Sequence, residues 1–387
     1  MIILKNFVFH SDKKKFLCYN KTAAVLRFRK RESMLKKRII SLILALTCIT
    51  FCGCSQTSTE ISEQGGSSAV QSDNSPKTRD VFAMDTYMTL KAYGENAAQA
   101  LEDAENEIVR LENILSVTKD DSDISRINNS HGTPQEVCDD TINIINAAAE
   151  YGNSTDGALD ITIYPVLKLW GFTTGEYKIP TQDEIDNLLE NVDYSRVAVN
   201  GNEVSLPENF SIDLGALAKG YTGDKIMEKL RSDGIKSAII SLGGNVQALG
   251  LKPDGSQWKV SVRNPFAPDT DMCVVSIDGK AVITSGNYER YFQGDDGNLY
   301  WHIIDPADGF PADSGIVSAT VIGDNGLMCD SLSTSLFIMG RERAENYYRE
   351  NGGFDMILVT DDGRIFYTGG IADSFENISN MPAEIIK

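Results

Sequence analysis

The chain has 387 residues, of which 42% are hydrophobic and 24% are charged, a composition typical of a folded protein rather than of a disordered one. Residues 1–53 hold 12 of the 36 basic and only 2 of the 55 acidic side chains, so the rest of the chain carries a net charge of about −29. That charge argues against nucleic-acid binding. It also means that a phosphorylated ligand needs a local cation, a lysine or a helix N-terminus.

The N-terminal residues have the pattern of a bacterial lipoprotein signal. A basic cluster at 36–38 precedes an apolar stretch at 39–51 that is too short to span a bilayer comfortably, and Cys54 follows a glycine. We predict an upstream extension over residues 1–33, a signal peptide over 34–53 and lipidation of Cys54. The protein is then expected on the extracytoplasmic face of a bacterial cell membrane. An ordinary signal peptide or an uncleaved anchor is the alternative.

A polar, serine-rich stretch without periodicity covers residues 54–78 and predicts a flexible tether. The folded part is expected over residues 79–387. Its three cysteines, Cys138, Cys273 and Cys329, lack the spacing of a zinc site or a disulfide framework, so we expect them to be small buried side chains.

Hydrophobic periodicity in the folded part predicts helices interspersed with hairpins. Helices are expected over 101–115, 139–151 with Asp139 as N-cap, 217–231, 331–339 and 341–351. Hairpins with Asn-Gly or Asp-Gly turns are expected over 197–204, 274–283 and 356–367. Because no regular βαβ alternation is present, the pattern predicts an α+β fold of mixed helices and antiparallel hairpin sheets.

Two segments carry groups suited to a phosphorylated ligand and its counter-ion. Asp213 precedes a predicted helix whose first turn exposes free N–H groups, with Lys219 one to two turns on, and such a site suits a phosphate or a ribose hydroxyl. A capped helix with a solvated lysine is the alternative. Asp330 and Thr334 are spaced i and i+4, so both point to one helical face and offer oxygen ligands to Mg²⁺. An N-cap with a core-facing threonine is the alternative there.

Two further segments suggest a proton acceptor and a close approach of the backbone to a ligand. His302 lies where a predicted strand ends, and besides His131 it is the only histidine of the folded part. A histidine accepts a proton near neutral pH, although a structural role is equally open. The Gly-Gly pair before Asn245 permits close backbone approach, and a plain turn explains it equally well.

Taken together and in this order, the segments resemble the ApbE family of FAD:protein FMN transferases, over residues 80–375. The similarity rests on MDT (84–86), DSDISR (121–126), GALD (157–160), LWGF (169–172), DLGALAKG (213–220), SLGGN (241–245), TSGN (284–287), HIIDP (302–306) and DSLST (330–334). It implies a single catalytic unit of the T-fold-related ApbE type. The implied reaction cleaves FAD at its pyrophosphate, passes FMN to a Thr or Ser hydroxyl of a target flavoprotein and releases AMP, with Mg²⁺.

The resemblance also implies roles for individual residues. The implied FAD contacts are Met84, Ala158, Leu159, Asp160, Asp213, Lys219 and Ile304. The implied cation ligands are the Ala216 carbonyl, Asp330, Ser333 and Thr334, and His302 matches the histidine that activates the acceptor hydroxyl. Thr118 stands where the family often has an aromatic residue, so one stacking contact to FAD is absent from the expected set.

Other functions remain to be weighed against transfer. An enzyme of the same fold could hydrolyse FAD to FMN and AMP, since water would then replace the protein hydroxyl at the same site. A non-catalytic flavin-binding lipoprotein is a further alternative, although His302, Asp330 and Thr334 together exceed what binding requires. A Ser-His-Asp hydrolase is disfavoured because the chain has no GxSxG motif.

Overall fold

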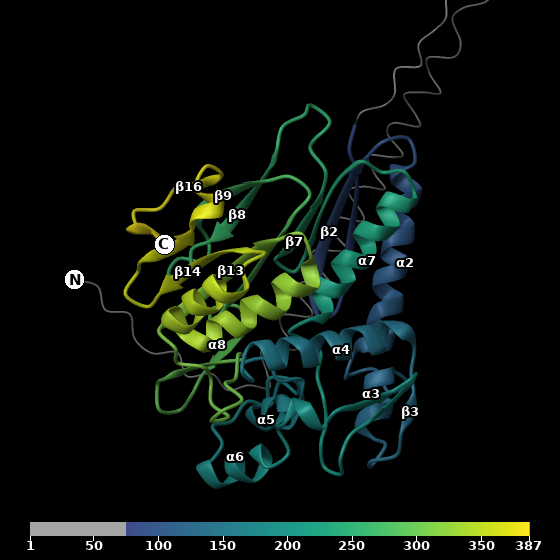
Figure 1. The fold of residues 1–387 in the computed structure, drawn as a ribbon, viewed down its shortest axis with the longest axis vertical. Helices are drawn as coiled ribbons and strands as arrows, with labels where there is room; N and C mark the ends of the chain where they lie inside the picture. The colour runs from purple at the N-terminus through teal and green to yellow at the C-terminus, as the bar shows by residue number, and fades with distance from the viewer. Residues whose placement is uncertain (1–74, 387) are drawn as a thin grey trace, which may run out of the picture. The chain divides into compact units, whose positions relative to one another are not determined.

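The computed structural model describes residues 75–386 (Figure 1). The predicted extension, the signal peptide, Cys54 and all but the end of the tether lie outside the described residues. The first strand begins at Lys77, so the last two residues assigned to the tether belong to the fold.

A nine-stranded sheet runs through the molecule in the spatial order β1-β2-β6-β7-β10-β13-β14-β15-β17. Neighbouring strands are antiparallel except β15 and β17, which are parallel. The strands of this sheet are β1 (Lys77–Ala83), β2 (Thr86–Tyr93), β6 (Ser237–Leu242), β7 (Asn245–Leu249), β10 (Ala281–Gly286), β13 (Ile316–Gly323), β14 (Asp355–Thr360), β15 (Ile365–Thr368) and β17 (Ala383–Ile386).

Three smaller sheets and ten helices complete the described part of the chain. The small sheets are β16-β9-β8 (Phe375–Asn377, Asp271–Ile277, Trp258–Arg263), β3-β5-β4 (Gln135–Glu136, Glu203–Ser205, Ala198–Asn200) and the hairpin β11-β12 (Tyr291–Gln293, Leu299–Trp301). The α-helices are α2 (Ala97–Leu115), α3 (Asp123–Asn128), α4 (Asp139–Ser154), α5 (Tyr164–Trp170), α6 (Gln182–Leu189), α7 (Ala218–Ser232) and α8 (Gly326–Asn351). The three short 3-10 helices are η1 (Ile161–Ile163), η2 (Tyr194–Arg196) and η3 (Gly369–Ile371). Helix α8 is broken at Gly340.

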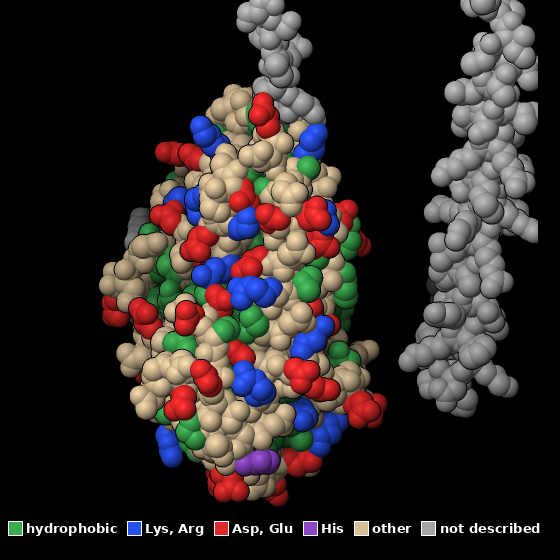
Figure 2. All heavy atoms as spheres, turned by 90° about the vertical axis from the view of Figure 1, so that its right-hand side faces the viewer, with side chains coloured by type: hydrophobic (Ala, Val, Ile, Leu, Met, Phe, Trp, Pro, Cys, Tyr) green, Lys and Arg blue, Asp and Glu red, His purple; other side chains and the backbone are tan. Residues whose placement is uncertain are grey.

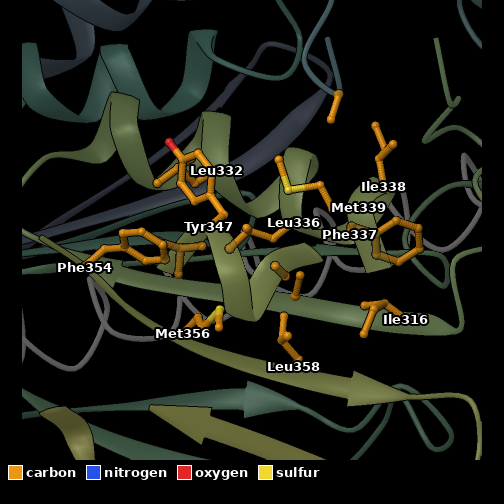
Figure 3. Close-up of a cluster of buried hydrophobic side chains, with 14 of the residues drawn as sticks. Ile316, Leu332, Leu336, Phe337, Ile338, Met339, Tyr347, Phe354, Met356 and Leu358 are labelled. Atoms are coloured by element: carbon orange, nitrogen blue, oxygen red, sulfur yellow. The ribbon is translucent and has the colours of Figure 1, made fainter. Parts of the chain in front are cut away.

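The central strands of the large sheet are buried on both faces. On β14, Met356 and Leu358 pack against α8, whereas the alternate residues Ile357 and Val359 pack against the β16-β9-β8 sheet. Figure 3 shows the first of these interfaces, with side chains of α8 facing those of β13 and β14. Since Leu336 is fully buried there, its truncation to Ala is expected to cost about 2–5 kcal/mol of stability.

The helices α2 and α7 cover the β1-β2-β6 end of the sheet (Figure 1). The predicted apolar face of α2 is confirmed: Leu101, Ala104, Ile108, Leu111 and Leu115 are all buried. The predicted α+β fold with antiparallel hairpins is confirmed as well, including hairpins β4-β5 and β14-β15.

Helices α7 and α8 approach closely through two glycines. A Cβ atom on Gly220 would lie 2.3 Å from the Gly326 carbonyl oxygen and 2.6 Å from the Asp330 Cβ atom. The carboxylate of Asp224, on α7, accepts the N–H groups of Gly326 and Leu327 at 2.7 and 2.8 Å and so caps α8 from outside. This packing places the second turn of α8 against the first turn of α7.

Four local predictions were wrong. The predicted hairpin at 274–283 does not form, because β9 pairs with β8 and β16 while β10 pairs with β7 and β13. The N-cap of α4 is Cys138, half-buried rather than buried, and Asp139 is the first helical residue. The helix expected from Ser331 begins at Gly326, and its predicted break is present at Gly340, where φ is 75°.

Charged side chains are dispersed over the described surface that carries α2 and α3. Figure 2 shows acidic and basic groups interspersed on this side, with no continuous basic stretch. None of the helices within residues 75–386 is both long enough and apolar enough to cross a membrane.

Candidate active site

Three polar segments predicted to carry chemistry meet around Lys219, the second residue of α7. Burial raises the pKa of Asp330 and of Asp213, and in both cases the Lys219 charge opposes the shift. The same charge helps to lower the pKa of His302. Lys219 therefore lies within electrostatic reach of three predicted site residues that come from separate parts of the sequence.

Asp330 lies in α8, and its carboxylate reaches across to the start of α7. Its side chain is buried, and the N–H group of Gly220 donates to it at 2.7 Å. Gly220 is the third residue of α7, so its N–H group is one of the first N–H groups of the helix, which have no acceptor inside the helix. Within the described part of the chain the Ala216 carbonyl accepts no hydrogen bond. The Asp330 carboxylate therefore caps the first turn of α7, and the Ala216 oxygen, just before that helix, is available to a ligand.

A cluster of hydroxyl groups lies one turn further along α8. Ser285, on β10, is 2.8 Å from Ser333 and 3.1 Å from Thr334, measured between their hydroxyl oxygens. Ser333 is fully buried and also donates to the Asp330 carbonyl at 3.0 Å. Thr334 is half-buried and has a lone pair to offer, whereas the hydroxyl of Ser333 is held by protein groups.

The imidazole of His302 is oriented by the backbone of Arg290. Its Nδ1 atom lies 3.2 Å from the Arg290 carbonyl oxygen, which also accepts the His302 N–H group at 3.1 Å. Because a carbonyl oxygen only accepts, Nδ1 carries the proton of this bond and Nε2 keeps its lone pair. Burial lowers the pKa of His302 to about 4, and the charges of Arg290 and Lys219 act in the same direction. His302 is therefore neutral at pH 7 and able to accept a proton at Nε2.

Arg290 interacts with His302 through its carbonyl oxygen and with Phe172 and Asp213 through its guanidinium. Its guanidinium donates to the Phe172 carbonyl oxygen at 2.6 Å, and its charge opposes the rise in the pKa of Asp213 that burial causes. The Asp213 carboxylate accepts a hydrogen bond from the Gly215 N–H group at 2.8 Å. The backbone N–H group of Asp213 donates to the Ile161 carbonyl oxygen at 2.9 Å. The loop before α7 is thereby held against the segment that follows α4.

The implied FAD contacts lie around this centre in different settings. Met84 sits in the β1-β2 turn with φ at 50°, and its sulfur is 3.9 Å from the Thr222 hydroxyl, one turn after Lys219. Ala158, Leu159 and Ile304 are buried in three separate apolar clusters. Their connection to the site is their position in the sequence: Ala158 and Leu159 directly precede Asp160, and Ile304 is two residues after His302.

Asp160 has a carboxylate that protein groups already occupy. It accepts the N–H and hydroxyl groups of Thr162 and, at 3.0 Å, the N–H group of Tyr194. Burial raises the pKa of this carboxyl, and the three donors oppose the shift. Asp160 therefore fixes the loop that carries Ala158 and Leu159, and its own oxygens have little capacity left for a ligand.

Three residues at the site were missing from the predicted set. Ser285 and Arg290 lie in the segment that begins TSGN, which was singled out without assigning them roles. Asn245 is 3% exposed and its Nδ2 atom has no hydrogen-bond partner among the described residues, although its amide helps to lower the pKa of Asp330. A buried donor without a partner beside a carboxylate is typical of a binding site. The Gly-Gly motif before Asn245 was the only signal for it.

Two hollows of the described surface lie away from the residues around Lys219. One of about 560 Å³ is lined by residues such as Asn264 and Asn380, and another of about 240 Å³ by residues such as Gln257 and Asp355. Neither contains a residue of the cluster around Lys219. The assignment of the site therefore rests on the grouping of the side chains.

Comparison with known proteins identifies the family of this chain. The model of the ApbE family matches residues 84–358, which is more than half of the chain. The chain belongs to the ApbE family. A relative from Treponema pallidum, named FAD:protein FMN transferase, is 30% identical over 318 residues and covers 76% of this chain and 88% of its own length.

Solved structures of ApbE proteins share the fold. The ApbE protein of Thermotoga maritima has a TM-score of 0.71 and 30% identity, covering 75% of this chain and 96% of its own. The flavinyl transferase ApbE of Pseudomonas stutzeri, in its apo form, has a TM-score of 0.70 and 26% identity, covering 79% and 98% respectively.

Proposed function

We propose that this ApbE protein is an FAD:protein FMN transferase, which moves FMN from FAD to a Thr or Ser hydroxyl of a target flavoprotein. The observation that carries the proposal is the convergence on Lys219 of a neutral, oriented histidine and two carboxylates from distant segments. The choice of FAD as substrate rests on family membership, because several relatives are named FAD:protein FMN transferase.

In the reaction the acceptor oxygen bonds to the FMN phosphorus of FAD, and the bond from that phosphorus to the bridging oxygen breaks. AMP leaves with the bridging oxygen, and the acceptor proton passes to Nε2 of His302. The bond from Nδ1 to the Arg290 carbonyl fixes the tautomer that makes this possible. Burial lowers the pKa of His302 in the free enzyme, and the charges of Arg290 and Lys219 add to this shift. The charge of an arriving pyrophosphate offsets these cations and so raises the basicity of His302 when a base is needed.

Two cations of the chain match the charge of the pyrophosphate. Lys219 and Arg290 both lie within electrostatic reach of Asp213 and His302. In a protein whose folded part is strongly acidic, they supply the local positive field that an anionic substrate requires. Asp213, held by Gly215, is placed to accept a hydroxyl donor of the substrate.

The donor set also fits a divalent cation, and we include Mg²⁺ in the proposal. The Asp330 carboxylate, the Ala216 carbonyl and the Thr334 hydroxyl are hard oxygen donors, with Ser333 adjacent. Bound Mg²⁺ would neutralise charge on the phosphate oxygens and the departing AMP. No group of three or more His, Cys, Asp or Glu side chains suited to a metal occurs within residues 75–386, so water and substrate oxygens are needed to complete six-fold coordination.

The proposal extends to location and partner. Cys54 is the lipidated residue, and residues 54–76 then tether the enzyme to the extracytoplasmic face of the cell membrane. The partner is a flavoprotein that presents its acceptor motif on the same side of the membrane. The signal pattern of residues 34–54 supports this part of the proposal.

The test is incubation of the full chain with FAD, Mg²⁺ and the unmodified form of a flavoprotein that carries covalent FMN. Mass spectrometry should find FMN joined by a phosphoester to one Thr or Ser, and changing that residue to Ala should abolish the addition. Unmodified acceptor after complete consumption of FAD would contradict the proposal.

A further inference from the structure

The hairpin β11-β12 stands apart from the large sheet and ends at the catalytic histidine. It pairs Tyr291 with Trp301 and Gln293 with Leu299, and no third strand joins it among the described residues. His302 directly follows β12, and its N–H group continues the ladder by bonding to Arg290. The hairpin therefore leads from the surface to the base.

The ladder leaves the backbone groups of β12 free on its outer side. Backbone hydrogen bonds join His302 to Arg290 and Gly294 to Asn298. In an antiparallel pair, hydrogen-bonded and non-hydrogen-bonded residue pairs alternate. The pairs 291/301 and 293/299 are therefore of the non-hydrogen-bonded kind. Their N–H and C=O groups point outward. None of the hydrogen bonds within residues 75–386 satisfies those of Leu299 or Trp301.

The surface around this edge is apolar and has an acidic end. Leu299, on β12, is 53% exposed, and Tyr291, opposite Trp301 on β11, is 51% exposed; both are large hydrophobic side chains. The hairpin tip carries Asp295 and Asp296, and Asp296 accepts from Tyr300 at 2.7 Å. An exposed, unprotected strand edge is a ready template for pairing with another chain. Apolar side chains beside it, with acidic groups at the tip, suit a segment that is apolar near the site and neutral or basic at the tip.

We propose that the outer edge of β12, at Leu299 and Trp301, binds the acceptor segment of the target flavoprotein as an added β-strand. This inference rests on the proposed transferase function and names where its protein substrate binds. A residue opposite His302 on the added strand shares its face, with Cβ atoms about 4.5–5.5 Å apart. That separation brings a Thr or Ser hydroxyl within reach of Nε2.

The edge is also firmly supported from behind, which a template for an incoming strand requires. Tyr300 and Phe292 stack with ring centroids 5.4 Å apart, and Trp170 lies 5.2 Å from Tyr300. The indole of Trp301 donates to the Ala312 carbonyl at 3.2 Å. The hairpin therefore does not have to order itself when the acceptor arrives, so more of the pairing free energy appears as affinity.

A matched pair of proline variants tests which edge is used. Leu299→Pro removes an outward N–H group from β12, and Gln293→Pro removes the cross-strand equivalent from β11. Neither N–H group takes part in the hairpin ladder. Leu299→Pro should raise KM for the acceptor flavoprotein about tenfold or more. The dissociation constant of FAD and the kcat at saturating acceptor should stay within about twofold, and Gln293→Pro should change none of the three.

The outcomes separate the two proposals. If the wild-type chain transfers FMN but Leu299→Pro leaves KM unchanged, or both variants raise it equally, edge binding by β12 is wrong while the transferase function stands. If the wild-type chain transfers no FMN, the function fails and this inference with it.

Hydrogen exchange of the wild-type chain gives a second test that depends on no variant. With the unmodified acceptor bound, the amides of Leu299 and Trp301 should exchange at least about tenfold more slowly, and those of Tyr291 and Gln293 at their original rate. Unchanged exchange at Leu299 and Trp301 under saturating acceptor would overturn the proposal.

Discussion

His302 has both a fixed ring orientation and a lowered pKa. Its ring is fixed by the Arg290 carbonyl, and burial with two neighbouring cations keeps it neutral well below pH 7. A structural histidine would use both ring nitrogens, whereas no hydrogen bond to Nε2 is found among the described residues. This geometry favours the catalytic interpretation over the structural one that the sequence left open.

Replacing His302 should therefore separate chemistry from binding. His302→Ala is expected to slow transfer about 10²–10⁴-fold while the dissociation constant of FAD changes little. Single-turnover transfer and fluorescence titration of FAD measure the two quantities. His131→Asn is the matched control, because His131 is exposed and has a positive φ that Asn tolerates. Normal transfer by His302→Ala would remove this residue from the mechanism.

The pH dependence of the free enzyme should show the low pKa of this histidine. An unperturbed histidine base would halve kcat/KM near pH 6.5 as it becomes protonated. With a pKa of about 4, His302 stays unprotonated there, so kcat/KM should remain flat between about pH 8 and 6 and fall only at lower pH. The fall in kcat should lie at higher pH, because the substrate charge raises the pKa in the complex. A midpoint of kcat/KM at pH 6.5 would contradict this account.

Asp330 is the only carboxylate in the proposed cation set, and it also holds the N–H group of Gly220. Asp330→Ala should abolish transfer and weaken FAD binding together, whereas Asp330→Asn should keep the hydrogen bond and retain part of the rate. A chelator should act like Asp330→Ala on the wild-type chain, and added Mg²⁺ should reverse the chelator but not the mutation. Full activity in chelator, with metal-free protein verified by elemental analysis, would exclude the cation.

At the scale of elements, the contact between α7 and α8 sets the geometry of the site. A methyl group on Gly220 would meet the Gly326 carbonyl and the Asp330 Cβ atom, so Gly220→Ala must push the helices apart. We expect a loss of about 1–3 kcal/mol in stability and weaker Mg²⁺-dependent FAD binding. Thermal unfolding and FAD titration measure these effects. Glu228→Ala, at an exposed position of α7, should change neither, and Gly220→Ala with unaltered FAD binding would show that the contact does not position Asp330.

Elements with local signals were predictable, and elements defined by distant partners were not. The apolar spacing of α2 and the Gly340 break in α8 are local properties, and both were predicted. The start of α8 depends on Asp224, about a hundred residues away, so nothing near Ser331 could indicate it. Likewise the Asp278-Gly279 turn was recognisable, but a turn signal does not specify that the next strand stays in the same sheet.

The same distinction applies to the site. Asp213, Lys219, His302, Asp330 and Thr334 were identified through motifs, and the structure brings Asp213, His302 and Asp330 within electrostatic reach of Lys219. Arg290 acts on His302 through its backbone carbonyl, which any residue type could supply, so no sequence pattern predicts that role. Ser285 matters through its distance to Ser333 and Thr334, which only the fold defines.

At the scale of the whole molecule, charge and location are linked. The folded part is strongly acidic, and the positive groups at the site are few and specific. If Cys54 is lipidated, Cys54→Ala should release the protein from the membrane fraction or block its processing, which fractionation and gel mobility measure. Cys138→Ala, in the folded part, is the control. A Cys54→Ala protein that fractionates and migrates like the wild type would refute the lipoprotein prediction.

The central claim is that the hydroxyl of a protein, rather than water, receives FMN at this site. The most direct measurement is the ratio of AMP released to FMN bound on the acceptor, followed over time with the full chain, FAD, Mg²⁺ and excess unmodified flavoprotein. We expect one AMP for each acceptor modified, with no free FMN, and loss of both products together in His302→Ala. Accumulation of AMP with an equal amount of free FMN, and no FMN on the acceptor, would identify the protein as an FAD pyrophosphatase and contradict the account.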